Sequence, residues 1–205
     1  MKMYNQFAMI HVVFDRAGGV LKVFSPDGAT MRSNFAATGD AWGRASNPND
    51  GPHGHFWPIA TGHYVLTKWE SWGVAGAAPS EGYGQIYVMD LDDATKQRLI
   101  DANFCKVQGD YLVIGGIALP RGGLAAWGRS EIMVHGGGSN APQPLAPMQP
   151  LCSTDGCTRV HNQDWPAIVN DLAGTHLSFP PAAGSGAFQE TVVYSVIGDS
   201  PPATC

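Results

Sequence analysis

Residues 153–164 read Ser-Thr-Asp-Gly-Cys-Thr-Arg-Val-His-Asn-Gln-Asp, and residues 134–137, upstream of them, read Val-His-Gly-Gly. The two segments contain the parts of a thiol nucleophile and its base: a cysteine that follows a glycine, a nearby arginine, and a histidine that ends an apolar run. A cysteine attacks a carbonyl as the thiolate, which is a minor species at neutral pH unless a neighbouring imidazole takes the proton. We therefore predict that Cys157 is the nucleophile and that His135 is its base.

The glycine before the cysteine suits the same chemistry. Gly156 has no side chain, so a substrate carbonyl can approach the backbone N–H groups of Gly156 and Cys157. Two backbone donors aimed at one point would hold the oxyanion that forms when a thiolate adds to a carbonyl. The expected catalytic residues are therefore Cys157, His135 and Gly156.

The chain order separates the families of cysteine acyl-transfer enzymes. In papain-like peptidases the cysteine precedes the histidine, whereas here His135 precedes Cys157. Sortases share the order found here but space these residues more widely. The two segments resemble the YkuD-type L,D-transpeptidase catalytic domain, whose signature is an apolar strand ending in His-Gly, then Ser/Thr-x-Gly-Cys-x-Arg, often followed by Asn-x-Asp. Residues 132–136, 154–159 and 162–164 match that signature piece by piece.

One position departs from the family, because Asp155 stands where many members have a second histidine. A carboxylate beside the nucleophile disfavours the thiolate, so we expect this difference to affect rate and substrate choice. Two roles are open for Arg159. Its guanidinium would either hydrogen-bond a carboxylate and backbone carbonyls as a structural group or bind an anionic substrate. Asn162 has the same two roles open. Thr154 would hydrogen-bond the catalytic loop or the substrate, and Gly136 is expected to line the substrate site.

The resemblance implies that the substrate is a peptidoglycan stem peptide. Cys157 would attack the carbonyl between a diamino acid such as meso-diaminopimelate and the terminal D-alanine. His135 would act as the base in acylation and as the acid toward the leaving amine. The thioester would pass to an amine, giving a cross-link or an exchanged D-amino acid, or to water, as in a carboxypeptidase. This chemistry needs no metal and no cofactor.

An alternative from another class is a non-catalytic structural or wall-binding module of the same fold, within a virion or a secretion assembly. The replacement at Asp155 favours it. The intact set of Cys157, His135 and Arg159 argues against it, because a module that only binds has no need of a base paired with a thiol.

The composition indicates one β-rich domain over residues 1–205. The chain has 26 Gly and 15 Pro, with 44% hydrophobic and 14% charged residues, which favours strands joined by many loops over a helical bundle. Together with the resemblance, this predicts a mainly β sandwich or barrel with a few short helices. The net charge is −5 and no basic run occurs, so we expect no nucleic-acid partner.

The N-terminal residues 1–7 lack the uninterrupted apolar core and the small-residue cleavage site of a signal peptide. No apolar span of membrane-crossing length follows in the sequence, so we expect no Sec signal and no membrane partner. Peptidoglycan lies outside the cytoplasm. The expectation is therefore delivery by a phage particle, a lysis system or a secretion machine, with virion or secretion-machine components as partners.

Periodicity and turn residues predict the individual elements. Strands are expected at residues 8–14, 20–24, 35–40, 58–66, 85–89, 111–114, 129–135 and 191–197, the first two as a hairpin. Helices are expected at residues 94–100, with Asp92 or Asp93 as the cap, and at residues 165–172, with Asp164 as the cap.

Three further features carry weaker predictions. His53 and His55 form a His-x-His pair that would need ligands from elsewhere to hold Zn²⁺, so we expect them to face solvent or substrate. Four cysteines do not form a dense framework, so disulfides are not required. Cys152 is either a buried small residue or a resolving thiol that protects the nucleophile. The loop at residues 136–151 is expected to overhang the cleft as a lid or a substrate-binding loop.

Overall fold

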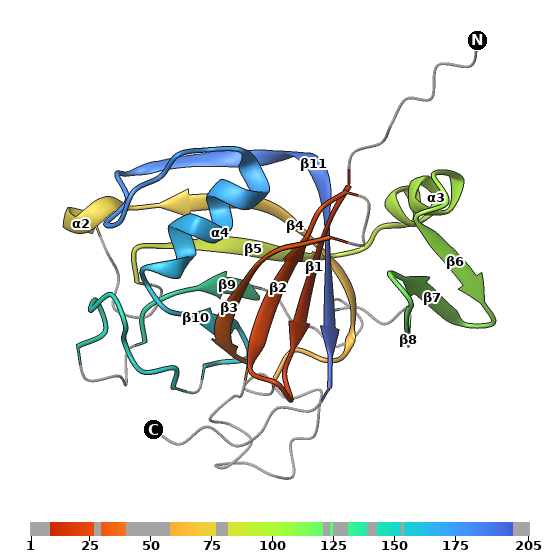
Figure 1. Cartoon of the computed structure of the whole chain (residues 1–205), viewed down its shortest axis with the longest axis horizontal. Coiled ribbons are helices and arrows are strands. Elements are labelled where there is room, and N and C mark those ends of the chain that lie inside the picture. The colour runs from red at the N-terminus through yellow and green to blue at the C-terminus, as the bar shows by residue number, and fades with distance from the viewer. Residues whose placement is uncertain are drawn as a thin grey trace.

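The chain is mainly β, as predicted. The computed structural model describes residues 9–26, 30–39, 58–76, 82–120, 124, 131–138, 143–152 and 154–198. Within them, eight strands form a closed barrel and three form a separate small sheet, and the helices are short (Figure 1). No helix in these ranges combines the length and the apolar character needed to cross a membrane.

The barrel closes in the order β1-β11-β4-β5-β9-β10-β3-β2. Its strands are β1 (Met9–Asp15), β2 (Val20–Phe24), β3 (Met31–Thr38), β4 (Gly62–Ser71), β5 (Gly84–Asp90), β9 (Met133–His135), β10 (Thr158–Val160) and β11 (Gly184–Ile197). Two neighbouring pairs, β1 with β11 and β9 with β10, run parallel, and the remaining pairs are antiparallel. The parallel pair β9 and β10 is the one that positions the site described below.

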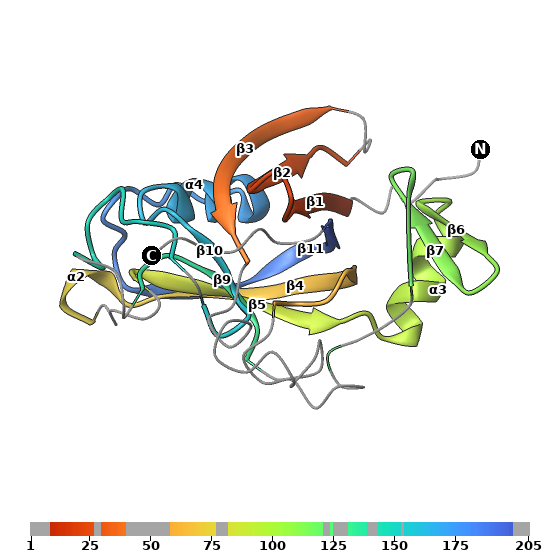
Figure 2. The same cartoon turned by 90° about the horizontal axis from the view of Figure 1, so that it is seen from below.

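The barrel interior is filled by the inward side chains of the strands and by one face of α4 (Asp164–Ala173). Trp165, Ile168 and Leu172 of α4 are three and four residues apart, so they share one face, and all are buried in the barrel core. The Trp165 ring meets the Trp69 ring edge-on at a centroid distance of 6.5 Å. Burial of each such side chain contributes roughly 1.5–3 kcal/mol to folding. Figure 2 shows that α4 lies at the opposite end of the barrel from the small sheet.

The N-terminal cap of α4 differs from the prediction. The N-cap position belongs to Gln163, which makes no side-chain cap bond, while Asp164 lies in the first turn. The predicted cap at Asp164 is therefore wrong by one residue, although a carboxylate in the first turn still interacts favourably with the helix dipole. Pro166 also lies in the first turn, where its missing N–H costs nothing. Gly174 ends the helix with a φ of 63°.

The small sheet and α3 (Asp93–Asp101) form a unit between β5 and β9 in the chain. The sheet contains β6 (Cys105–Gln108), β7 (Tyr111–Ile114) and β8 (Ile117–Pro120). The predicted Asp92 cap is confirmed, since its carboxylate accepts from the Thr95 N–H at 2.6 Å. A second apolar cluster joins this unit to the barrel; it contains Met9, Leu91, Leu99, Cys105, Leu112, Ile114 and Val193.

A polar triad beside this interface, here called the buried histidine cluster, consists of His11, His63 and Ser195. The Ser195 hydroxyl lies 2.9 Å from His11 Nε2 and 2.6 Å from His63 Nδ1. His63 Nε2 contacts the Leu112 carbonyl oxygen of β7 at 3.1 Å, which ties the barrel to the small sheet. Burial, followed by the charge of His63, lowers the pKa of His11 to about 4. Burial likewise lowers the pKa of His63, so the cluster is uncharged at neutral pH.

The remaining predicted strands are present with shifted ends. β3 begins earlier and β9 is shorter than expected, and β11 starts seven residues before the predicted Thr191. Three strands (β6, β8 and β10) and the single turn α2 (Gly73–Gly76) were not predicted. Residues 1–7, Cys205, His53 and His55 lie outside the described residues, so the expectations that concern them are not addressed.

Candidate active site

The two motif segments meet because β9 and β10 are neighbours. Their parallel register places Arg159 opposite His135 and Thr158 opposite Val134. Val134 and Thr158 are fully buried on the inner side of the barrel, so His135 and Arg159 lie on the other face of the same sheet. Cys157 immediately precedes β10. The structure therefore pairs the predicted base with the arginine, and the predicted nucleophile lies two residues before that arginine in the chain.

His135 is held in one orientation at the end of β9. Its Nδ1 lies 2.5 Å from the Gly136 carbonyl oxygen. A carbonyl only accepts, so Nδ1 carries the proton and Nε2 has the lone pair. Burial lowers the pKa of His135 to about 4, and the positive charge of Arg159 adds to the effect. The imidazole is therefore neutral at neutral pH, which is the state that a general base requires.

Cys157 carries a thiol that is not part of a disulfide, and it is 7% exposed. Its Sγ donates to the Glu131 carbonyl oxygen at 3.6 Å. Its own carbonyl oxygen accepts from the Thr154 hydroxyl at 2.8 Å. The first contact directs the thiol toward Glu131, and the second fixes the backbone of Cys157 just before β10.

Arg159 supplies positive charge next to the thiol. Its Nη1 donates to the Cys152 carbonyl oxygen at 2.8 Å. Burial lowers the pKa of Arg159 to about 10, against the opposing influence of the negative charges of Cys157 and Asp155. A guanidinium within interaction range of a cysteine favours the thiolate. Of the two open roles, the 3% exposure favours a fixed charge over a group that reaches out to a substrate.

Asp155 faces solvent, and its charge interacts with Arg159. Water screens an exposed carboxylate, whereas the arginine beside the thiol is buried. The charge of Asp155 is therefore more strongly screened than that of Arg159, and its effect on rate and substrate choice stays a prediction.

Thr154 and Gly156 stabilise the loop that contains Cys157. The Thr154 hydroxyl accepts from the Gly156 N–H at 3.0 Å while it donates to the Cys157 carbonyl oxygen. Gly156 has a φ of 106°, which favours glycine over any other residue. The predicted oxyanion donor at Gly156 is thus corrected, because a nearby hydroxyl already takes that N–H. Thr154 acts on the loop, the first of its two predicted roles.

Asn162 and Gly136 position the turn that follows His135. Asn162 is fully buried; its Oδ1 accepts from the Gly137 N–H at 2.8 Å, and its Nδ2 donates to the Pro144 and Ala146 carbonyl oxygens at 2.9 and 2.8 Å. A Cβ on Gly136 would lie 2.2 Å from that Oδ1, so only glycine fits. Gly136 was expected at the substrate, and Asn162 either at the substrate or in a structural role. Their contacts instead assign them to holding the base, and Asn162 takes the structural one of its two open roles.

Gln149 is a site residue that sequence reasoning missed. It is fully buried, accepts from the Asn162 N–H at 2.7 Å and donates to the Val160 carbonyl oxygen at 2.8 Å. Together with Asn162 it ties residues 143–151 to the site. Residues 143–151 were predicted to be part of a lid, but these hydrogen bonds hold them in place as structural support for the site. Residues 139–142 of the predicted loop lie outside the described residues. A lone glutamine in a Pro-rich loop gives no sequence signal for this role.

Cys152 is fully buried and disulfide-bonded. The first predicted reading, a buried small residue, is confirmed. The second, a resolving thiol, is corrected, because the sulfur is already oxidised. Its carbonyl oxygen is also the acceptor for Arg159. The bond therefore anchors the segment that fixes the site's positive charge.

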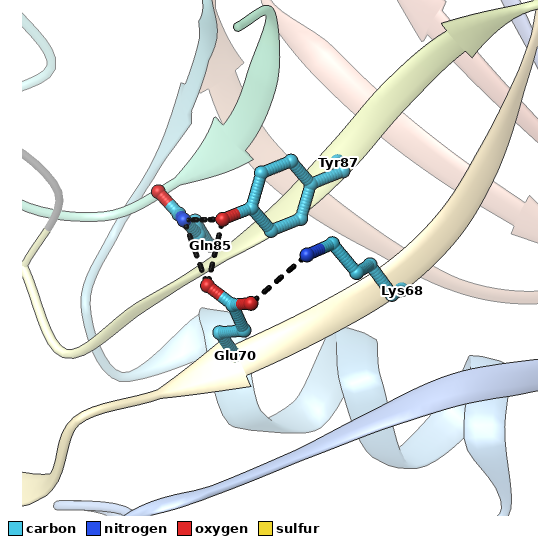
Figure 3. Close-up of polar contacts among 4 residues, drawn as sticks. All are labelled: Lys68, Glu70, Gln85 and Tyr87. Carbon is cyan, nitrogen blue, oxygen red and sulfur yellow. Dashed lines mark hydrogen bonds and ion pairs between the residues drawn. The ribbon is translucent and has the colours of Figure 1, made fainter.

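A second group missed by sequence reasoning lies farther along the same sheet. Lys68 and Glu70 of β4 and Gln85 and Tyr87 of β5 form a connected set, here called the polar cluster (Figure 3). The alternation in Lys-Trp-Glu and Gln-Ile-Tyr signals one polar face for each strand. The register that joins the two faces to His135 is not readable from the sequence.

No group of three or more histidine, cysteine or carboxylate side chains that could hold a metal ion occurs in the part of the chain that the structure describes.

Comparison with known proteins gives little further information. No protein-family model matches the chain, and no curated protein matches it. Among solved structures, Bd1075 from Bdellovibrio bacteriovorus superposes with a TM-score of 0.44 and 14% identity. The match covers 95% of this chain and 53% of that one, so this chain spans about half the length of Bd1075. A similarity of this size supports no conclusion about function.

Proposed function

We propose that this chain is a cysteine acyl-transfer enzyme acting on peptidoglycan stem tetrapeptides, of the YkuD-type L,D-transpeptidase kind. The observation that carries the proposal is the parallel register of β9 and β10. It joins two motif segments that are separate in the chain, pairs His135 with Arg159, and leaves Cys157 directly before the strand that carries Arg159. An activated thiol needs a base and a source of positive charge, and the three residues supply both.

In the proposed reaction, the Cys157 sulfur adds to the carbonyl carbon between the diamino acid and the terminal D-alanine. His135 Nε2 takes the thiol proton and returns it to the D-alanine nitrogen as the C–N bond breaks. The stem peptide is left as a thioester on Cys157. An amine or water then adds to the thioester carbonyl, loses a proton to His135, and releases the thiol.

The disulfide at Cys152 supports a site of action outside the cytoplasm. Disulfides persist in the periplasm, in secreted proteins and on virions, and are rare in reducing compartments. Delivery by a phage particle, a lysis system or a secretion machine agrees with this chemistry. Detection of the protein in virions or in culture supernatant would support that route, and strict retention in the cytoplasm would exclude it.

The test of the proposed function is covalent labelling. Wild type, Cys157→Ala and Cys105→Ala are each incubated with a carbapenem, a β-lactam class that acylates this family's nucleophile, and their intact masses are measured. Cys105 also carries a thiol outside any disulfide, but it lies in the second apolar cluster. We expect an adduct on wild type and Cys105→Ala and none on Cys157→Ala.

The companion measurement is muropeptide analysis of sacculi treated with the same three proteins. Loss of terminal D-alanine, its exchange, or new cross-links should appear with wild type and Cys105→Ala only. An unlabelled wild type with unchanged muropeptides would favour the non-catalytic module instead.

A further inference from the structure

One row of side chains links the candidate site to the polar cluster. Arg159 is opposite His135, His135 is opposite Gln85, and Gln85 is opposite Glu70. Residues directly opposite in neighbouring strands point to the same face of a sheet. The row therefore crosses β10, β9, β5 and β4 on the face that carries the base. It runs from a buried cation at Arg159 to a carboxylate at Glu70.

The carboxylate of Glu70 is held in place by three donors. The Tyr87 hydroxyl donates to Glu70 Oε2 at 2.6 Å, and Gln85 Nε2 donates to the same oxygen at 3.2 Å. Lys68 Nζ contacts the other oxygen, Oε1, at 3.0 Å. The hydrogen bond from Tyr87, and then that from Lys68, lowers the pKa of Glu70. Glu70 therefore presents a fixed negative charge.

The Lys68 ammonium occupies a position that would suit any primary ammonium. It contacts the Glu70 carboxylate and lies 4.1 Å from the centroid of the Tyr87 ring (Figure 3). A carboxylate beside an aromatic face is a favourable environment for a cation. The side chains of Lys68 and Glu70 are 50% and 30% exposed, and an exposed ion pair contributes only about 0–1 kcal/mol. A ligand ammonium can therefore replace that of Lys68 at small cost.

We propose that the polar cluster binds the side-chain ammonium of the acyl donor's diamino acid, and that Lys68 fills this subsite when no substrate is bound. The inference rests on the proposed function. Neighbouring strands are about 4.8 Å apart, so β5 lies about 10 Å and β4 about 14 Å from β10. The Glu70 carboxylate reaches from β4 toward β5, where Tyr87 and Gln85 hold it, so about 10 Å has to be spanned. The side chain of Tyr87 and that of a bound diamino acid can close this gap from its two sides.

The distance of the polar cluster from Cys157 also indicates that it binds the acyl donor rather than the acceptor. An acceptor amine must come within about 3–3.5 Å of the thioester carbon on Cys157. The Glu70 carboxylate is on β4, three strands away from β10. An amine held there is too distant to react. The cluster therefore recognises the donor and leaves the acceptor side of the thiol to other groups.

The test compares two tetrapeptides with lysine as the third residue, one with a free side-chain amine and one with that amine acetylated. With wild type we expect kcat/KM for release of D-alanine to be about tenfold higher for the free amine. Glu70→Gln should remove this preference by slowing the free-amine peptide alone. Lys68→Met should lower KM for the free-amine peptide, because it removes the internal competitor; a Lys68 that only stabilised the sheet would not have this effect.

Matched controls are Asp93→Asn and Lys96→Met, which break an exposed ion pair of 2.9 Å on α3. They make the same charge changes and should leave kcat/KM unchanged for both peptides. Two outcomes would overturn the subsite while leaving the proposed function intact. One is equal kcat/KM of wild type for both peptides, and the other is an equal loss of kcat/KM for both peptides in Glu70→Gln. A rise in KM in Lys68→Met would also overturn it. Turnover of neither peptide would remove both the proposed function and this inference.

Discussion

The candidate site and the buried histidine cluster contain similar groups in different settings. Each has a buried histidine whose pKa is lowered to about 4, and each has a potential nucleophile, Cys157 or Ser195. In the cluster, the Ser195 hydroxyl is shared by two imidazoles, and it is completely buried at the interface of the barrel with the small sheet. In the candidate site, Arg159 adds a positive charge beside the thiol.

The difference shows that a histidine close to a hydroxyl does not make an active site. Within the described residues, the hydroxyl of Ser195 contacts two neutral imidazoles and its side chain is fully buried. Cys157 instead lies within range of the Arg159 charge and is 7% exposed. The candidate site has a cation, a glycine-rich turn and a row of polar residues that leads to solvent. The charge of Arg159 and the partial exposure of Cys157 are therefore the differences on which the proposed catalysis depends.

The largest expected effect comes from His135→Gln. Glutamine can still donate to the Gly136 carbonyl oxygen but cannot act as a base, so kcat for acylation should fall by about 10²–10⁴-fold. Stopped-flow or quenched mass spectrometry with a carbapenem would measure it. His176 is exposed, and His176→Gln is the control that should acylate at the wild-type rate. If His135→Gln were acylated at the wild-type rate, His135 would have a structural role only, like the histidines of the buried histidine cluster.

Acidification should weaken both regions together. His11 and His135 have folded pKa values of about 4, against 6.5 for ordinary histidine. Between these values the unfolded chain binds more protons, so the free energy of unfolding is at its plateau above pH 6.5 and falls as the pH drops toward 4. Each group contributes roughly 3 kcal/mol over this window. Urea titrations at pH 7, 6, 5 and 4.5 would measure the loss.

Variants divide the acid effect between the two regions. His11→Gln and His135→Gln should each flatten the pH dependence of unfolding in part. A free energy of unfolding that stays constant from pH 7 to pH 5 would contradict the neutral state assigned to these buried histidines.

The smallest expected effect is that of Ser195→Ala. It leaves the imidazoles of His11 and His63 without their shared hydroxyl, and an unsatisfied buried polar group costs about 1–3 kcal/mol. Carbapenem acylation of the folded protein should be unchanged. Thermal unfolding together with the labelling assay would measure both. Ser178→Ala, at an exposed position, should lie within about 0.5 kcal/mol of wild type. A loss of acylation in folded Ser195→Ala would give the cluster a catalytic role.

Local patterns predicted much of the fold. The hairpin at β1 and β2, the helix α3 and the histidine at the end of β9 all follow from alternation, turn residues or a cap that occupy a few neighbouring positions. β10 was missed because it is only three residues long and follows the nucleophile directly. The first half of β11 was missed because its glycines hide the alternation.

The site was predictable in its members but not in all of their roles. The motif identified Cys157, His135 and Arg159 because their order and spacing lie within the sequence. The engagement of the Gly156 N–H by Thr154 depends on the exact backbone path of a loop, since a hydroxyl two residues away competes for the same donor. The row from His135 to Glu70 depends on strand register, which joins segments that are far apart in the chain.

The parallel pairing of β1 with β11 has a consequence for biosynthesis. Met9 lies opposite Thr191, so barrel closure must join segments separated by most of the chain. Contacts this distant in sequence are slow to form, because the chain between them loses its freedom first. A nascent chain already contains Cys157 and His135 before β11 leaves the ribosome, yet β4 then lacks one of its two neighbours. We therefore expect the Cys157 thiol to become reactive only when β11 has paired with β4 and β1. The proposed activity would then begin only after β11 has been translated.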